Sequence, residues 1–226
     1  MSKDALLLHG GFAGAWEWQG VIEELSRAGI TARAIDLPSK QPGGSLADDE
    51  KAVRQELDGF AEPVVLVGHS FSGAVIGAAS AGNDKVAHLV YVAAAKPDVG
   101  QSVMSSCADA PQEPVEAPTD GSDWMEGDDA TKHALYSDLS DEEFAKVEPN
   151  LQGHSGRVFT EIVSGQGWKE HPYTYVVATL DQIFPVDIQR RWAADANHVV
   201  EIEAGHAPMA GKPAEVAAAI AAAANA

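Results

Sequence analysis

The chain has 226 residues, of which 34 are acidic and 15 are lysine or arginine, so its formal net charge is −19. This balance argues against nucleic acid and against an anionic membrane surface as partners. No stretch approaches the roughly 18 uninterrupted apolar residues of a membrane span, and Cys107, the single cysteine, allows no internal disulfide. We therefore expect one soluble, cytoplasmic domain, or a core with a small insertion.

Short apolar runs alternate with helical patterns along most of the chain. Strands alternating with helices predict an α/β fold with a mostly parallel sheet that helices cover on both faces. The helices carry apolar stripes, such as Val21, Ile22 and Leu25 in the first. The predicted strands span residues 5–8, 31–35, 64–67, 86–92, 173–178 and 198–202.

The composition changes between residues 97 and 170. Prolines, glycine and serine make a loop-like stretch near residues 111–123, without apolar periodicity. Ser140-Asp141-Glu142-Glu143 is a capping box that predicts a helix, and a second helix is predicted over residues 156–163. We expect residues 97–170 to form a lid over the carboxyl edge of the sheet. Residues 1–96 and 171–226 would then form the core.

A sharp turn follows the third predicted strand, in the sequence Gly68-His69-Ser70-Phe71-Ser72-Gly73. A β-branched run followed by small residues and a serine predicts a nucleophile elbow, which holds a serine hydroxyl at the edge of a parallel sheet. The pattern is usually G-x-S-x-G, and the fifth position here is Ser72. Serine is small enough for the same close contact between helix and strand.

An acid and a histidine follow two later predicted strands, Asp181 after residues 173–178 and His206 after residues 198–202. Serine, then acid, then histidine is the chain order of α/β-hydrolases. Each of the three residues ends a strand, where an open α/β sheet presents its ligand site. An alternative acid, Asp98, follows the strand after the nucleophile helix, although a residue beside a proline in a loop is more often on the surface.

These residues predict a mechanism in which Ser70 attacks an acyl carbon and His206 is the general base. Asp181 would hold the imidazole in the right tautomer and stabilise its protonated form. The tetrahedral oxyanion needs two N–H donors, which we assign to the backbone of Phe71 and of Gly11. The predicted function is that of a serine hydrolase that acts through an acyl-enzyme.

Further motifs make the chain resemble a known family. It is similar to the plant methylesterase and hydroxynitrile lyase group and its bacterial esterase relatives, within the α/β-hydrolase superfamily. The resemblance covers most of the chain and is thinnest between residues 105 and 131. It implies a cofactor-free carboxylesterase that acts on small or aromatic, often hydrophobic, esters. The matching motifs are His9-Gly10-Gly11, Gly14-Ala15-Trp16-x-Trp18, the serine elbow, Thr179-x-Asp181-x-Ile183-Phe184-Pro185, Gln189-Arg190, Gly205-His206-Ala207-Pro208 and Lys212-Pro213.

Two departures from the hydroxynitrile lyases of this group argue against cyanohydrin cleavage. The residues after the catalytic histidine and after the first-loop histidine are Ala207 and Gly10, where those lyases have lysine and threonine. Without the lysine charge, departing cyanide loses its main electrostatic support. Serine at position 70, in place of aspartate, also argues against haloalkane dehalogenase and epoxide hydrolase chemistry.

Other functions on this fold stay open at the level of sequence. The pocket could serve a small-molecule receptor with vestigial hydrolysis. Lactones, thioesters and carbon–carbon bonds are hydrolysed by the same serine chemistry. An intact triad with both oxyanion positions favours catalysis, because a pure binder has no need of a general base. The expected partner is a small-molecule ester, and a homodimer is compatible with the sequence.

Several aromatic residues and histidines have two interpretations. Trp124, Phe144 and Trp168 would line a substrate pocket under the lid, or pack the lid itself. We expect His9 and His69 to brace their loops by hydrogen bonds without acting as the base. The remaining histidines show no spacing typical of a metal site, so we expect no metal and no cofactor.

Overall fold

A central sheet of six parallel strands organises the computed structural model, which describes residues 3–108 and 120–226. The strand order across the sheet is β2-β1-β3-β4-β7-β8. The strands are β1 Ala5–Leu8, β2 Ala32–Ile35, β3 Val64–His69, β4 Val86–Val92, β7 Tyr173–Ala178 and β8 His198–Ile202. The central strands are buried on both faces, which explains why they read as continuous apolar runs. The predicted α/β fold is confirmed.

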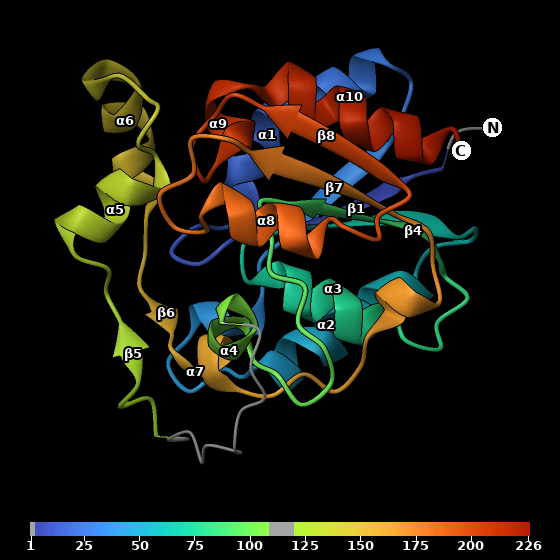
Figure 1. Cartoon of the computed structure of the whole chain (residues 1–226), viewed down its shortest axis with the longest axis horizontal. Coiled ribbons are helices and arrows are strands. Elements are labelled where there is room, and N and C mark those ends of the chain that lie inside the picture. Colours follow the sequence, from blue (N-terminus) through green and yellow to red (C-terminus); the bar gives the residue numbers. More distant parts are fainter. Residues whose placement is uncertain (1–2, 109–119) are drawn as a thin grey trace.

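Helices cover both faces of this sheet (Figure 1). The helices α1 (Gln19–Arg27) and α10 (Pro213–Ala224) pack together on one face. The other face carries α2 (Leu46–Asp58), α3 (Ser72–Ser80) and α8 (Val186–Trp192). Each face contributes its own apolar core, because the side chains of a strand alternate between the two sides.

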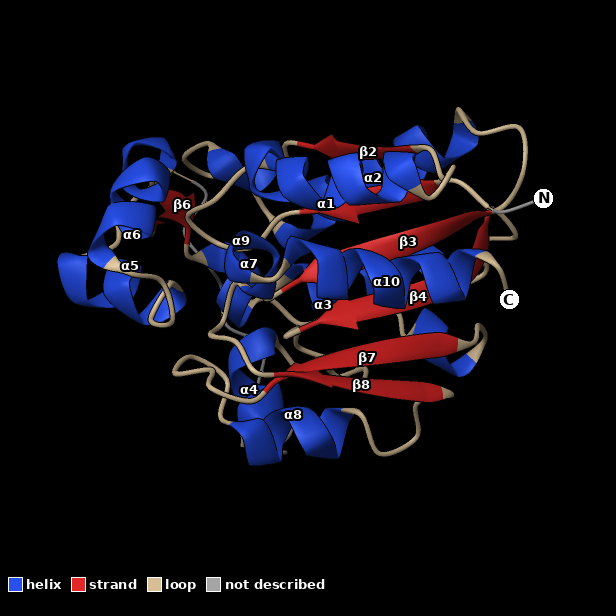
Figure 2. Cartoon of the chain, turned by 90° about the horizontal axis from the view of Figure 1, so that it is seen from above, coloured by secondary structure: helices blue, strands red, loops and turns tan. Residues whose placement is uncertain are grey.

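The segment between β4 and β7, here called the insertion, contains only short elements. Most of them lie beyond the carboxyl ends of the strands (Figure 2). Two of them, β5 and β6, form an antiparallel pair. The elements are α4 Val103–Cys107, β5 Trp124–Met125, α5 Asp129–Leu135, α6 Asp141–Val147, η3 Glu148–Asn150, β6 His154–Ser155, α7 Arg157–Thr160 and η4 Gly167–Lys169. The remaining short helices are η1 Ala15–Trp18, η2 Pro38–Lys40 and α9 Pro208–Gly211.

One of the two helices predicted in this segment is confirmed and the other is much shorter than expected. The Ser140 capping box is present, and α6 begins at the next residue. The helix predicted over residues 156–163 is only α7, Arg157–Thr160, because Glu161 turns to an extended conformation. The Glu161 side chain instead bonds to Arg157 and to the first N–H of α2, that of Leu46. Tertiary contacts therefore end this helix early.

Candidate active site

The turn after β3 places Ser70 in a left-handed conformation, with φ at 57°. A residue other than glycine is strained there, and such strain is typical of functional turns. Gly68 is required because a Cβ at its position would lie 2.7 Å from the Ser72 carbonyl oxygen. The Ser72 hydroxyl donates to the carbonyl of His9. Serine at the fifth position of the motif therefore bonds the elbow to the loop that follows β1, here called the first loop. A glycine could not form this bond.

The three residues predicted as a triad come together at the carboxyl edge of the sheet. The Nε2 atom of His206 lies 2.8 Å from Ser70 Oγ, and its Nδ1 atom lies 2.8 Å from Asp181 Oδ2. The side chains of His206 and Asp181 are fully buried, and Ser70 is 5% exposed. We refer to Ser70, His206 and Asp181 as the candidate triad. Its arrangement is that of a nucleophile, a general base and an orienting acid.

Besides His206, three hydrogen-bond donors hold the Asp181 carboxylate. Its Oδ1 atom accepts from the N–H groups of Ile183 at 2.7 Å and Phe184 at 3.0 Å. Its Oδ2 atom accepts from Gln189 Nε2 at 2.9 Å. Gln189 is itself fully buried, on α8, and its amide also bonds to the backbone of Ala178. The sequence analysis named Gln189 only as part of a motif shared with the family it resembles and gave it no role, and that motif was the available signal.

The two predicted oxyanion donors are the backbone N–H groups of Gly11 and Phe71. Gly11 lines the same cavity as Ser70, and Phe71 follows it directly in the chain. Within the described part of the chain, neither backbone N–H donates to a protein acceptor. Both groups therefore meet one requirement of an oxyanion hole, namely donors not already used by the fold.

Two of the other sequence candidates lie outside the triad. His9 braces its loop, since its Nε2 accepts from the N–H of Leu37 at 3.0 Å and its Nδ1 donates to the Gly10 carbonyl. Burial lowers the pKa of His9, so this ring stays neutral. The alternative acid Asp98 is exposed and pairs with Lys169 at 3.1 Å. Its carboxylate makes no described contact with His206, because Asp181 already occupies that imidazole.

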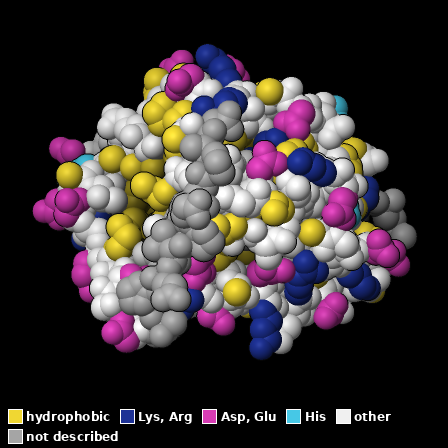
Figure 3. Space-filling model, turned by 60° about the horizontal axis from the view of Figure 1, so that its bottom comes forward, with side chains coloured by type: hydrophobic (Ala, Val, Ile, Leu, Met, Phe, Trp, Pro, Cys, Tyr) yellow, Lys and Arg dark blue, Asp and Glu magenta, His cyan; other side chains and the backbone are white. Residues whose placement is uncertain are grey.

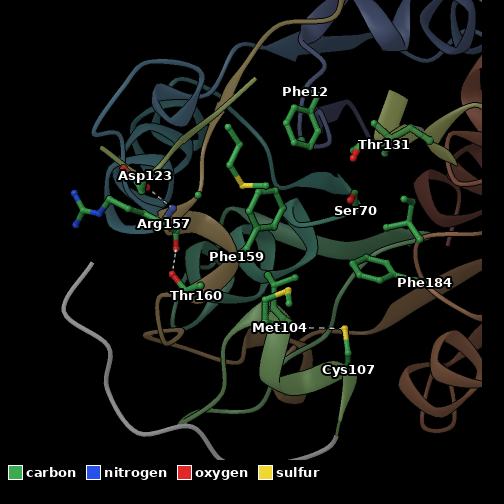
Figure 4. Close-up of a pocket in the computed structure, with 16 residues that line it drawn as sticks. Phe12, Ser70, Met104, Cys107, Asp123, Thr131, Arg157, Phe159, Thr160 and Phe184 are labelled. Atoms are coloured by element: carbon green, nitrogen blue, oxygen red, sulfur yellow. Dashed lines mark hydrogen bonds between the residues drawn. The ribbon is translucent and has the colours of Figure 1, made fainter. Parts of the chain in front are cut away.

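A cavity of about 600 Å³ opens in front of Ser70 (Figure 4). Phe12, Phe159 and Phe184 point into it around the serine. Hydrophobic side chains gather at the surface of this part of the molecule, as Figure 3 shows. The lining residues are Gly11, Phe12, Ser70, Val103, Met104, Cys107, Asp123, Met125, Thr131, Leu135, Gly156, Arg157, Phe159, Thr160, Ile183 and Phe184. Most of them are apolar, so the site favours apolar groups on both sides of a reacting carbonyl.

The two charged residues at the cavity wall are engaged with protein groups. Arg157 forms an ion pair with Glu161 at 2.6 Å and donates to the Gly43 carbonyl at 3.0 Å. Asp123 accepts from the N–H of Arg157 at 2.8 Å and from the Ser155 hydroxyl. A charged substrate would have to compete with these bonds, which favours a neutral one.

None of the three predicted pocket residues is among the described residues that line this cavity, which corrects that prediction. The indole of Trp124 packs over Gly153 and donates to Glu126 at 2.8 Å. Phe144 packs within the insertion, where its ring centroid lies 6.2 Å from that of Tyr136. Trp168 lies against α3, with Lys96 Nζ 3.7 Å from its ring centroid. Phe144 is buried and the two indoles are partly buried, each in local contacts, which is the alternative that the sequence left open.

The sequence analysis missed the three phenylalanines that surround Ser70. Phe12 follows the His9-Gly10-Gly11 motif, and Phe184 lies three residues after Asp181, so their positions beside functional motifs were an available signal. Phe159 had no such signal, because it comes from the insertion. Within residues 3–108 and 120–226, no group of three or more His, Cys, Asp or Glu residues is placed to hold a metal ion. Nor does any helix of those residues have the length and apolarity to cross a membrane.

The fold and the candidate triad define the kind of site that α/β hydrolases use. The model of the alpha/beta hydrolase family matches residues 5–219, and the chain belongs to this family. Among its relatives, the alpha/beta hydrolase nvfD of Aspergillus novofumigatus is 28% identical, over 87% of this chain and 86% of its own. Methylesterase 2 of Arabidopsis thaliana is 31% identical, over 92% and 90%.

Solved structures agree with this assignment. A pyrethroid hydrolase from Sphingobium faniae has a TM-score of 0.82 and 25% sequence identity, and the match covers 100% of this chain and 98% of that one. The relatives and structural neighbours of this chain are thus hydrolases and esterases, which supports a hydrolase.

Proposed function

We propose that the protein is a serine carboxylesterase that hydrolyses small or aromatic hydrophobic esters through an acyl-enzyme. One observation carries the proposal: Ser70 Oγ lies 2.8 Å from the imidazole of His206 and faces an apolar cavity of about 600 Å³. A nucleophile hydrogen-bonded to a base, which an acid orients in turn, is the arrangement that acyl transfer requires.

In the proposed mechanism, Ser70 Oγ attacks the ester carbonyl while its proton passes to His206 Nε2. Asp181 stabilises the imidazolium through Nδ1, and the N–H groups of Phe71 and Gly11 bind the oxyanion. The proton then moves from His206 to the leaving alcohol as the carbon–oxygen bond breaks. Water then attacks the acyl carbon as its proton passes to His206, and His206 returns a proton to Ser70 Oγ as the bond between the acyl carbon and Oγ breaks, which releases the acid and the free serine.

The cavity and the relatives both support neutral, apolar esters as substrates. The Arabidopsis relative is a methylesterase, a name that points to esters, and the Sphingobium neighbour is a pyrethroid hydrolase. In this proposal residues 97–170 act as a lid, because they supply Val103, Met104 and Phe159 to the cavity while the core supplies Ser70. The lid would therefore select the substrate, and the core would perform the reaction.

The test is hydrolysis of p-nitrophenyl acetate and butyrate by the purified protein, without added metal or cofactor. We expect turnover that Ser70→Ala lowers by roughly 10⁴-fold or more, the loss typical of removing such a nucleophile. Turnover that survives in Ser70→Ala would contradict the serine mechanism. A folded wild-type protein that turns over neither ester would contradict general esterase activity.

A further inference from the structure

A buried acid lies behind the candidate triad and takes no part in the proposed reaction. Glu17, in η1, has a side chain that is 2% exposed. Its Oε1 atom accepts from the N–H of Gly10 at 2.9 Å and lies 3.1 Å from Nδ1 of His69. Its Oε2 atom is buried and bonds to no described group. An ionisable group in such a place is costly unless its partner is charged.

His69 supplies that charge. It is the last residue of β3, directly before Ser70. Its Nδ1 faces the Glu17 carboxylate, and its Nε2 lies 2.9 Å from the backbone carbonyl of His206. An ionised Glu17 and a backbone carbonyl both accept hydrogen bonds, so beside a Glu17 carboxylate both ring nitrogens carry a proton, which makes the ring an imidazolium.

The surroundings of His69 support this protonation state. Burial would by itself lower the pKa of His69, but the Glu17 carboxylate and the His206 carbonyl oppose it, and the pKa lies above its ordinary value. Asp181 acts in the same direction from further away. Two further rings lie beside it, the indole of Trp18 at 6.5 Å and the imidazole of His206 at 5.0 Å between ring centroids.

We infer that Glu17 and His69 form a charged bridge that positions the catalytic loops, an inference that rests on the proposed esterase function. The bridge joins three separate segments: the first loop through the N–H of Gly10, the elbow through His69 itself, and the general-base loop through the His206 carbonyl. These segments would carry an oxyanion donor, the nucleophile and the base. Both members are positioning residues, because neither side chain lines the cavity.

The charge gives the bridge its strength. Charge-assisted hydrogen bonds are shorter and about twice as strong as neutral ones. Gly10 adds a steric constraint, since a Cβ at its position would collide with the His69 ring, so the first loop packs directly on the bridge. Loops held in this way keep their donors and base in place as the reaction proceeds, and small displacements there are expensive in rate.

Glu17→Gln tests the bridge, since it keeps the shape of the side chain and removes the charge. We expect kcat for p-nitrophenyl acetate to fall roughly 10- to 100-fold, the scale of a small misplacement of reacting groups. The KM should change less than about twofold, because the cavity is untouched. The matched control is Glu50→Gln, another glutamate in an ion pair, with Arg54 on α2, whose kcat should equal that of the wild type. Unchanged kcat in folded Glu17→Gln would overturn the inference.

Pairing Glu17→Gln with His69→Gln asks whether the two residues act as one unit. If they do, the double variant loses about as much kcat as the more damaging single variant. Fully additive losses would contradict a shared bridge.

A spectroscopic measurement on the wild-type protein decides the charge state without any activity. Imidazole ¹⁵N and ¹³C shifts of His69 should be those of an imidazolium at pH 7.5, and in Glu17→Gln those of a neutral ring. A neutral His69 in the wild type at this pH would overturn the bridge, even if Glu17→Gln failed to fold. A wild type that hydrolyses no ester, yet shows the imidazolium, would count against the esterase proposal while the charged pair itself stood.

Discussion

Two arrangements of serine, histidine and aspartate lie in this chain, and they differ in order and in access. In the candidate triad, the histidine lies between the serine and the acid. In the second arrangement, here called the buried trio, the serine lies in the middle. Ser39 Oγ is 2.6 Å from Asp49 Oδ2 and 3.2 Å from His154 Nε2. All three side chains of the buried trio are completely inaccessible to solvent.

The candidate triad and the buried trio contain the same three residue types, so residue types alone do not make a catalytic site. A serine becomes a nucleophile when a base accepts its proton and a cavity brings substrate to it. Ser39 does not meet the second condition, because it is completely buried and is not among the described residues that line the cavity in front of Ser70. The buried trio joins η2 and α2 of the core to β6 of the insertion, with His154 4.8 Å from Phe71 between ring centroids. We expect the buried trio to stabilise the attachment of β6 to the core.

Matched substitutions of Asp181 and Asp49 should give the largest difference in kcat between the two arrangements. We expect Asp181→Asn to lower kcat for p-nitrophenyl acetate roughly a thousand- to ten-thousandfold, because an amide supports the wrong tautomer of His206. Asp49→Asn should keep kcat within about threefold, because it touches no catalytic group. Steady-state kinetics on both variants provides the measurement. Comparable losses in the two would mean that the buried trio participates in the reaction.

The pH dependence of stability should distinguish the two acids next. Burial raises the pKa of Asp49 to about 7, against an ordinary value of 3.8 in the unfolded chain. The folded state therefore holds this proton more tightly, and its stabilisation is present at low pH and lost as the pH rises from about 4 to about 7. The upper limit of the slope is about 1.4 kcal/mol per pH unit.

Asp49→Asn supplies the control for this slope. An asparagine cannot ionise, so the variant lacks the proton-linked loss of stability that Asp49 causes. Urea unfolding at pH 5 and pH 8 should therefore show a smaller loss of the free energy of unfolding in the variant than in the wild type. Equal losses would mean that Asp49 is ionised throughout this range.

The two serines should differ in how much the loss of the hydroxyl changes the free energy of unfolding. Ser39→Ala should lower the free energy of unfolding by about 1–3 kcal/mol, because it strands buried polar partners. Ser70→Ala removes a hydroxyl beside the cavity and should change the free energy of unfolding by less than about 1 kcal/mol. Chemical denaturation measures both. Ser39→Ala with wild-type stability would show that the buried trio holds nothing.

Phe159 lies close to both arrangements. It lines the cavity in front of Ser70, and its ring centroid lies 6.0 Å from that of His154. We expect Phe159→Ala to lower kcat/KM for p-nitrophenyl butyrate about three- to tenfold more than for the acetate, because the longer acyl chain loses an apolar wall. Phe144→Ala is the control, since that ring packs within the insertion. An unchanged ratio in Phe159→Ala would place the acyl chain elsewhere.

Local pattern in the sequence predicted the parallel sheet, the elbow and the residues of the candidate triad. Each of these features depends on neighbours in the chain. The apolar run before Ser70 forms β3, the glycines allow the turn, and Asp181 and His206 follow strands whose carboxyl ends share one edge of the sheet. Residue order within a few positions therefore decides them.

Only the tertiary structure decided which side chains surround the reaction. Phe159 reaches Ser70 from the insertion, whereas Trp124 and Trp168 pack elsewhere. The contact between Glu17 and His69 spans 52 positions, and that between Ser39 and His154 spans 115. The periodicity of apolar residues along the sequence does not predict such pairs, because they depend on how segments distant in the chain pack against each other. Local sequence therefore indicates which reactive residues meet at the edge of the sheet, whereas long-range packing sets the cavity walls and the residues that support the triad.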